Sequence, residues 1–375
     1  MLPSVDDVRA GLHVVRVPMR VPFRGVSVRE VALLRGPAGW GEFAPFTEYG
    51  DAESARWLAA AVEAAWTGWP APRRESVPVN ATVPAVPAAD VPGVLARFPG
   101  CTTVKVKVAQ AGQVLADDVA RVAAVRDVLG AGGRIRVDAN AAWSVPAALT
   151  ALTALRPYGL EYAEQPCATL PELAALRRQL GGAVAIAADE SVRKASDPAR
   201  VAVAGAADLV VLKVAPMGGV AAALRVAAGC GLPVVVSSAL DTSVGIAAGL
   251  ALAAALPSLP YACGLGTVGL MAADVVVEPL VPRGGELPVG AVVPDPGLLA
   301  ELAAPPDVHA WWEARLLRCL DLLRRQEAPA PADAGGPPGA PGAPGAADAA
   351  QTAGAAQTAG AAGTAGAVGT AGVPA

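Results

Sequence analysis

Histidine is scarce in this sequence, and its cysteines are not spaced as metal ligands or disulfide partners. The 375 residues include two histidines, His13 and His309, and five cysteines that lie far apart with no Cys-x-x-Cys pair. This composition excludes a multi-histidine metal site and a cysteine zinc site, and it argues against a disulfide scaffold. The sequence therefore favours a reducing compartment, and the predicted location is the cytoplasm.

A large net charge and a long unbroken hydrophobic helix are also missing. With 29 basic and 33 acidic residues, the formal charge is −4, so no basic excess is available to neutralise nucleic-acid phosphates or an anionic membrane. Asp6 and Asp7 stand where a signal peptide would be basic, and Pro257 and Pro260 break the longest uncharged stretch, residues 242–273. We predict a small-molecule partner, no nucleic acid and no membrane, and the sequence indicates no particular oligomeric state.

Lysine is the rarer cation by far. Only Lys105, Lys107, Lys194 and Lys213 are lysines, and the other 25 basic residues are arginines. In such an arginine-rich chain a surface lysine can change to arginine at little cost. A position that must lose a proton cannot change in this way, because guanidinium stays charged at any working pH. The lysines are therefore the first candidates for acid–base chemistry.

Between residues 76 and 300, short β-branched runs alternate with helical stretches rich in Ala, Leu and Arg. The expected strands are Val77–Val83, Thr103–Val108, Arg134–Asp138, Leu160–Glu164, Val184–Asp189, Asp208–Lys213, Pro233–Ser237 and a weaker run near Tyr261–Leu265. Eight strands with helices between them predict an α/β fold, a (β/α)8-type barrel over 76–300. A doubly wound sheet would need a glycine-rich phosphate turn after the first strand, where this chain has residues 84–87, Pro-Ala-Val-Pro.

The two ends of the chain lack this rhythm. Residues 1–75 predict the N-terminal part of an α+β capping domain, with an antiparallel pair at 14–21 and 27–34 and a helix at 52–66. Residues 301–325 predict a helical segment that returns to the cap, and its expected apolar positions are Trp311, Leu316, Leu317, Leu320 and Leu323. Residues 326–375 are rich in Ala, Gly and Pro and predict a disordered tail, since this composition buries too little apolar surface to offset its ordering entropy.

Ionisable residues close, or nearly close, five consecutive expected strands. Lys107, Asp138, Glu164, Asp189 and Lys213 are separated by 31, 26, 25 and 24 residues, and each gap is one strand–helix unit. Because the C-terminal ends of barrel strands meet at one mouth, these side chains should converge there. Three carboxylates from adjacent strands form an oxygen-rich site that suits Mg²⁺.

This arrangement predicts proton abstraction next to a substrate carboxylate. A lysine beside other cations and a metal has a lowered pKa, which makes it a useful base. A divalent metal at the substrate carboxylate stabilises the enediolate that forms when the α-proton leaves. A single strand-end acid is more often a helix cap or an ion-pair partner, but chance placement on five successive strands is a weaker explanation than a site.

Motifs at these strand ends resemble the enolase superfamily, in particular its muconate-lactonising subgroup, over about residues 1–325. They are Lys105–Lys107, Val137–Asn140, Glu164–Pro166, Ala188–Ser191 and Leu212–Lys213. More narrowly, Pro22–Gly25, Gly39–Phe46 and Ser237–Gly245 resemble the actinobacterial branch of the o-succinylbenzoate synthase family. This resemblance implies a Mg²⁺-dependent carbon–oxygen lyase of menaquinone biosynthesis. Its reaction is the syn-dehydration of 2-succinyl-6-hydroxy-2,4-cyclohexadiene-1-carboxylate (SHCHC) to o-succinylbenzoate.

The resemblance also implies a role for each residue at the mouth. Lys107 is expected to take the α-proton and then to act as the acid that helps hydroxide to leave, while Lys213 holds a positive charge against the ring. Lys105 is expected to orient Lys107 and the substrate carboxylate. The other implied roles are Mg²⁺ ligation by Asp138, Glu164 and Asp189, contacts with the succinyl end by Ser237 and Ser238, and supporting hydrogen bonds by Asn140 and Glu190.

Two related reactions are excluded or disfavoured, and two alternatives stay open. The mandelate-racemase type is excluded because it needs a histidine on the later barrel strands, and His13 and His309 lie outside the predicted barrel. A dipeptide epimerase is disfavoured because it needs an Asp-x-Asp motif at the eighth strand, where residues 261–266 contain no acid. An N-acylamino-acid racemase, with Lys107 and Lys213 as opposed bases, fits the same residues. A metal-free Schiff-base lyase with Lys213 as the nucleophile is the alternative from another class.

Overall fold

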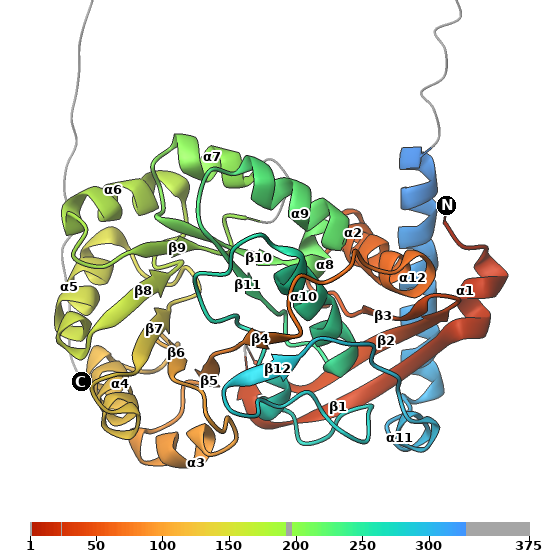
Figure 1. Ribbon diagram of the computed structural model, residues 1–375, viewed down its shortest axis with the longest axis horizontal. Helices are drawn as coiled ribbons and strands as arrows, with labels where there is room; N and C mark the ends of the chain where they lie inside the picture. Colours follow the sequence, from red (N-terminus) through yellow and green to blue (C-terminus); the bar gives the residue numbers. More distant parts are fainter. Residues whose placement is uncertain (1, 24, 193–196, 328–375) are drawn as a thin grey trace, which may run out of the picture. The chain divides into compact units, whose positions relative to one another are not determined.

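The computed structural model describes residues 2–23, 25–192 and 197–327 (Figure 1). Lys194 and residues 328–375 of the predicted tail lie outside the described residues. The central feature is a parallel sheet of seven strands, in the order β11-β10-β9-β8-β7-β6-β5. Its strands are β5 (Ala81–Val83), β6 (Thr103–Lys107), β7 (Arg134–Asp138), β8 (Leu160–Glu164), β9 (Ile186–Ala188), β10 (Leu209–Lys213) and β11 (Val234–Ser237).

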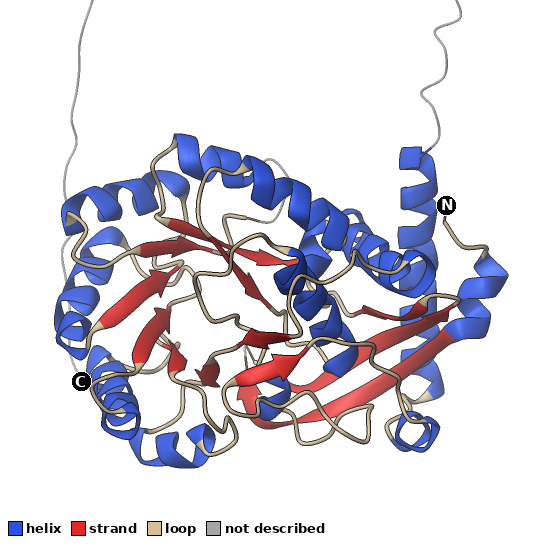
Figure 2. Ribbon diagram, in the orientation of Figure 1, coloured by secondary structure: helices blue, strands red, loops and turns tan. Residues whose placement is uncertain are grey.

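The sheet curls into a ring, and helices cover its outside (Figure 2). Parallel bridges Val79↔Cys263 and Ser237↔Gly264 join its two edges, so the weak eighth strand expected near residues 261–265 is reduced to these contacts. The covering helices are α3 (Val91–Leu95), α4 (Leu115–Leu129), α5 (Val145–Leu155), α6 (Leu170–Leu180), α7 (Asp197–Val203), α8 (Val214–Met217), α9 (Val220–Gly229) and α10 (Ser243–Ala255). The predicted (β/α)8-type architecture is confirmed.

The uncharged stretch near residue 250 forms α10, which is buried on almost every side. Thr242 caps its N-terminus by accepting a hydrogen bond from the Val244 N–H. Across the described ranges, no helix combines the length and the apolar character that crossing a membrane requires. Shorter helical turns connect the elements at η1 (Glu63–Thr67), η2 (Ala88–Asp90), η3 (Arg156–Tyr158) and η4 (Thr267–Leu270).

The first expected strand, residues 77–83, is two strands with different partners. Its first part, β4 (Ser76–Pro78), pairs antiparallel with β12 (Glu286–Pro288), and only β5 joins the barrel sheet. Pro78 has no N–H to donate to a neighbouring strand, so the chain can change its strand partner here without losing a hydrogen bond from this residue.

An antiparallel sheet and helices from both chain ends form the cap. The sheet has the order β1-β2-β3, from β1 (Leu12–Phe23), β2 (Val26–Gly36) and β3 (Gly39–Phe43), and β3 was not predicted. The cap helices are α1 (Val5–Gly11), α2 (Asp51–Val62), α11 (Pro296–Glu301) and α12 (Pro306–Glu327). The boundaries between cap, barrel, returning helical segment and tail, at residues 75, 300 and 325, stay a prediction.

Of the apolar positions expected in the last helix, Leu316, Leu320 and Leu323 are buried, but Trp311 was wrong by one residue. Trp311 is 45% exposed, whereas Trp312 is 1% exposed, packs edge-on against Phe43 and donates from its indole nitrogen to Glu30. A shift of one position turns a helical side chain by about 100°, which here separates the solvent face from the buried face. The buried face of α12 consists of Trp312, Arg315, Leu316, Cys319, Leu320 and Leu323.

A carboxylate of the cap joins the cap to the barrel. Glu42 of β3 accepts hydrogen bonds from the N–H groups of Thr242 and Gly245 at 3.2 and 2.9 Å, and from the Thr242 hydroxyl at 2.5 Å. These donors lie at the N-terminus of α10, and their hydrogen bonds oppose the burial that raises the pKa of Glu42. Glycine is needed at 245, because a Cβ there would lie 2.9 Å from Glu42 Oε2.

Candidate active site

The alternating sequence of the barrel strands decides which side chains enter the barrel. In β6, Val104 and Val106 are fully buried against the helices, so Lys105 and Lys107 point to the interior. The register then aligns the strand ends, with Lys107 beside Asp138 and Asp138 beside Glu164. Residues that are tens of positions apart in sequence therefore meet at one mouth.

One cavity gathers most of the predicted site. Eight of the ten predicted residues line it: Lys105, Lys107, Asp138, Asn140, Asp189, Lys213, Ser237 and Ser238. Glu164 and Glu190 do not line the cavity but bond to residues that do. Glu164 accepts from Lys105, and Glu190 accepts from Asn140 at 2.9 Å. The structure thus brings all ten together through direct lining or a single hydrogen bond.

Each of the three predicted ligand carboxylates is paired with a lysine. Lys105 Nζ lies 2.9 Å from Glu164 Oε1 and 3.5 Å from Asp138 Oδ2. Lys107 Nζ lies 2.5 Å from Asp138 Oδ2 and donates to Asn140 Oδ1 at 2.7 Å. Lys213 Nζ lies 2.5 Å from Asp189 Oδ2. Which lysine pairs with which acid was not predictable from the strand-end pattern.

Burial and charge give the two lysines of β6 opposite character. Burial and the neighbouring Lys105 lower the pKa of Lys107, although Asp138 opposes the shift. Burial acts in the same direction on Lys105, but Glu164 and Asp138 outweigh it and raise the pKa of Lys105. Lys107 is therefore suited to lose a proton, and Lys105 is suited to remain a cation.

The donor chemistry of the three carboxylates fits a hard divalent cation. Among residues 2–23, 25–192 and 197–327, no group of three His, Cys, Asp or Glu side chains is arranged to hold a metal, because these carboxylates turn toward lysines. Burial raises the pKa of Glu164 to about 7, and Asp138 and Asp189 add to this shift by repulsion. A cation such as Mg²⁺ would offset that repulsion, and oxygen ligands are those it prefers.

Two amide side chains hold the acids in place. Asn140 connects Lys107 to Glu190, whose pKa is raised by burial and by Asp189. Gln165 is fully buried, and its side-chain oxygen accepts from the N–H groups of Asp189 and Ser191. Gln165 lies within the quoted strand-end motif, but the sequence did not indicate this positioning of Asp189.

The two predicted substrate serines face the cavity but also serve the barrel closure. Ser237 and Ser238 donate to the Gly264 carbonyl oxygen at 3.3 and 2.8 Å. The Ser238 hydroxyl also lies 2.9 Å from the Thr267 hydroxyl. Their oxygen atoms can still accept a hydrogen bond from a ligand.

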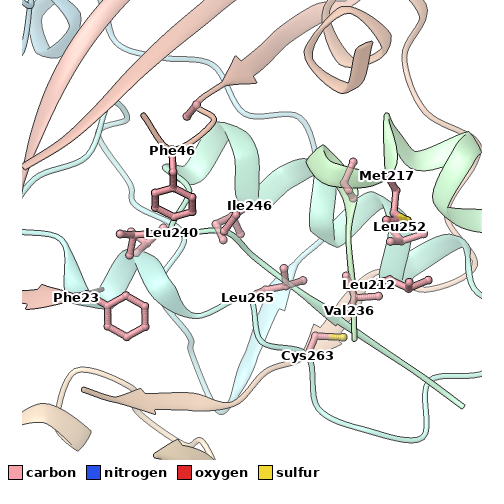
Figure 3. Packing of buried hydrophobic residues seen from close by; sticks show 14 of the residues in the cluster. Phe23, Phe46, Leu212, Met217, Val236, Leu240, Ile246, Leu252, Cys263 and Leu265 are labelled. Carbon is pink, nitrogen blue, oxygen red and sulfur yellow. The ribbon is translucent and has the colours of Figure 1, made fainter. Parts of the chain in front are cut away.

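An apolar wall of the cavity was missed by the sequence analysis. Phe23 and Phe46 from the cap and Leu240 from the barrel line the cavity, and Figure 3 shows the three side chains grouped together. Lys107 Nζ lies 5.2 Å from the centre of the Phe23 ring, within cation–π range. The only sequence signal for Phe23 and Phe46 was their place in the two quoted cap motifs. Their position at the cavity depends on how the cap packs on the barrel, which the sequence pattern does not show. Thr82 and Thr267 also line the cavity and were not predicted.

Backbone strain is concentrated around the same mouth. Within the described part of the chain, the non-glycine residues with positive φ are Ala109, Asn140, Ala141, Gln165 and Leu240. Each follows the C-terminal end of a barrel strand by one to three residues. Non-glycine residues hold such conformations only when surrounding contacts impose them, and they cluster at functional sites.

Family models and solved structures agree with this architecture. An enolase N-terminal domain-like model matches residues 14–65, and an enolase C-terminal domain-like model matches residues 94–305. The muconate lactonizing enzyme of Pseudomonas putida aligns with a TM-score of 0.66 at 20% identity, over 78% of this chain and 98% of its own. A dipeptide epimerase of Enterococcus faecalis aligns with a TM-score of 0.61 at 21% identity, over 75% and 97%. The fold and the strand-end site define an enolase-superfamily protein.

Sequence relatives narrow this class. The chain is 59% identical to the o-succinylbenzoate synthase of Mycolicibacterium smegmatis over 86% of this chain and 99% of that protein. It is 60% identical to the o-succinylbenzoate synthase of Thermobifida fusca over 80% and 93%. The chain belongs to the o-succinylbenzoate synthase family and is an enzyme of the lyase class.

Proposed function

We propose that this enzyme catalyses the Mg²⁺-dependent syn-dehydration of SHCHC to o-succinylbenzoate, a step of menaquinone biosynthesis in the cytoplasm. The observation that carries the proposal is the placement of Lys107 and Lys213 on β6 and β10, four strands apart around the ring, with buried carboxylates between them. The identity of 59% to a relative named o-succinylbenzoate synthase supports the same substrate.

Lys107 would carry both proton transfers. Burial lowers its pKa and so makes loss of a proton easier, and Asp138 and Asn140 hold Nζ in place. The amine would then take the proton α to the substrate carboxylate. The ammonium that forms would then give this proton to the departing hydroxide, which leaves as water. Both transfers occur on one face of the ring, as a syn-elimination requires.

Lys213 and Lys105 would act as fixed cations. Lys213 stays paired with Asp189 and would face the ring where negative charge develops, so it need not exchange a proton. Lys105 bonds both oxygens of Glu164 at 2.9 and 3.1 Å and would orient Lys107 and the substrate carboxylate. Ser237 and Ser238 would contact the succinyl end.

Asp138, Glu164 and Asp189 would hold the Mg²⁺ ion, with Asn140 and Glu190 as supporting partners. When bound, the ion supplies positive charge that stabilises the charge developing on the substrate carboxylate. Phe23, Phe46 and Leu240 line the cavity and would exclude water from around the bound substrate, which would strengthen the charge interactions there.

The experiment is a product assay with the full chain. Purified enzyme with SHCHC and Mg²⁺ should form o-succinylbenzoate, EDTA should stop the reaction, and added Mg²⁺ should restore it. Lys107→Ala is the inactive control. Absence of product with freshly made SHCHC, in the presence of Mg²⁺, would refute the proposal.

A second candidate is an N-acylamino-acid racemase of the same superfamily. The placement of Lys107 and Lys213 on opposite sides of the mouth favours it, since racemisation needs a base on each face. Efficient racemisation of N-succinylamino acids without dehydration of SHCHC would establish it. A Schiff-base lyase with Lys213 as the nucleophile would not need the three buried carboxylates, and borohydride trapping with a carbonyl substrate tests it.

A further inference from the structure

A second cavity lies beside Lys213, between the cap and the barrel. Its volume is about 30 Å³, and its lining includes Glu42, Trp57, Lys213 and Asp241. Lys213 also lines the active-site cavity, so the two spaces adjoin at this residue. A water molecule needs roughly 10–15 Å³ of such space and two or more polar partners, so this cavity has room for about two.

Trp57 of α2 lines this cavity and has an unused hydrogen-bond donor. The residue is 1% exposed, and its ring packs against Phe46 and Tyr49 at 6.2 and 6.1 Å between centroids. Its Nε1 is buried and has no hydrogen-bond partner among the described residues. Buried donors in folded proteins almost always have a partner, because leaving one unpaired is costly, so an acceptor near Nε1 is favoured.

Asp241 brings an unused acceptor. Its Oδ2 accepts from the Ala239 N–H at 2.9 Å across the turn at Leu240, and the described part of the chain gives its Oδ1 no partner. Glu42 differs, because both of its oxygens are bonded to the N-terminus of α10. Asp241 is therefore the carboxylate of this cavity that is available to a water.

Lys213 completes the set. Its Nζ bonds Asp189 Oδ2 on the side of the active site, and no other acceptor for it lies within the described ranges. An ammonium carries three N–H donors, so two are left for other partners. The residues that line this cavity thus offer two kinds of donor, from Trp57 and Lys213, and one carboxylate acceptor, from Asp241.

We propose that this cavity is a water site in which ordered water accepts from Trp57 Nε1–H and from Lys213 and donates to Asp241. Trp57 and Asp241 are then positioning residues that hold the Lys213 ammonium from behind, opposite Asp189. The water site stands on geometry alone. The consequence for catalysis rests on the proposed role of Lys213 as a fixed cation.

The direct test is a crystal structure of the wild-type enzyme with bound Mg²⁺, at a resolution that shows ordered water. Water is expected within hydrogen-bond distance of Trp57 Nε1 and Asp241. In Trp57→Phe the water should be absent or displaced, while in the matched control Trp311→Phe, an exposed tryptophan of α12, it should remain. A dry cavity in the wild type overturns the proposal.

The catalytic consequence is tested by a double-mutant cycle. In the wild-type background, Asp241→Asn should lower kcat about 10-fold with little change in KM. In the Lys213→Arg background the same change should lower kcat less than about 2-fold, because the larger guanidinium group of the arginine replaces the water contact. Asp274→Asn is the matched control, since Asp274 is a buried acid beside α10 that does not line this cavity. Its effect should be equal in both backgrounds.

Equal losses from Asp241→Asn in both backgrounds would show a merely structural role and overturn the positioning claim. The Kd for o-succinylbenzoate, measured for the same four proteins, repeats the cycle if Lys213→Arg is too slow to assay. If wild-type enzyme forms no product, the proposed function fails, and the crystallographic test of the water site still stands.

Discussion

Strand β7 contributes two buried ionic clusters to the barrel interior: Arg136 lies at the middle of the strand, and Asp138, which pairs with Lys105 and Lys107, lies at its C-terminal end. Arg136 is fully buried, bonds Glu161 at 2.5 Å, Asn80 at 3.0 Å and the Ala262 carbonyl at 2.7 Å, and stacks over Tyr162. The lysines at the mouth instead line a cavity and share their carboxylates.

The two clusters show what separates a structural ion pair from a reactive one. Guanidinium is planar and stays protonated, so Arg136 suits a fixed network inside the barrel. An ammonium is compact and can lose its proton, so lysine suits a mouth where Lys107 must act as a base. This difference explains why lysine persists at the mouth in a chain with 29 basic residues, most of them arginine.

The largest expected effect is loss of activity from isosteric changes at the mouth. Asp138→Asn, Glu164→Gln and Asp189→Asn should each lower kcat/KM by more than about 100-fold, because each removes a charge that the metal and a lysine need. Kinetics and Mg²⁺ binding by calorimetry measure the effect, and circular dichroism checks the fold. Near-normal activity in two of the three would contradict the ligand assignment.

The same kind of substitution at the other cluster should change stability instead. Glu161→Gln leaves the buried Arg136 without its charged partner and should lower the free energy of unfolding by roughly 2–4 kcal/mol. Urea unfolding measures this loss. Activity below the unfolding transition should stay within a few-fold of the wild type, and a 100-fold loss would erase the distinction between the two clusters.

The cap–barrel contact offers a steric test. Gly245→Ala places a Cβ 2.9 Å from Glu42 Oε2 and 2.7 Å from Asp241 Cβ, so the unfolding free energy should fall by about 1–3 kcal/mol. Gly93→Ala in α3 is the matched control, because a Cβ there meets nothing within 4 Å. Equal melting temperatures for the two variants would show that Glu42 does not need this space.

A smaller effect is expected from the protonation of Glu42. Burial and Asp241 raise the pKa of Glu42 to about 8 from its ordinary value near 4.5, so the native state keeps a proton that the unfolded state releases. Stability should therefore fall as pH rises from about 5 to 8, by about 1 kcal/mol or more relative to Glu42→Gln. Urea unfolding of both proteins at a series of pH values measures this change. A difference in unfolding free energy that stays constant from about pH 5 to 8 would show that Glu42 is ionised throughout and would contradict the prediction.

The sequence predicted the mouth better than its surroundings, for a physical reason. Repetition of the strand–helix unit brings strand ends together, so Lys107, Asp138 and Glu164 could be grouped by spacing alone. The pairing of each lysine depends on rotamers, and the approach of Phe23 depends on how the cap packs. Strand β3 and the hydrogen bonds of Glu42 to α10 likewise depend on contacts across about 200 residues of sequence.

The most direct test of the account is NMR of the SHCHC α-proton and of product formation in D₂O. Wild-type enzyme with Mg²⁺ should form o-succinylbenzoate, and Lys107→Ala should neither form product nor exchange the α-proton. Lys213→Arg should form product slowly yet still exchange the α-proton, since its guanidinium keeps charge but cannot act as a base. Exchange that persists in Lys107→Ala and disappears in Lys213→Arg would contradict the assignment of Lys107 as the base.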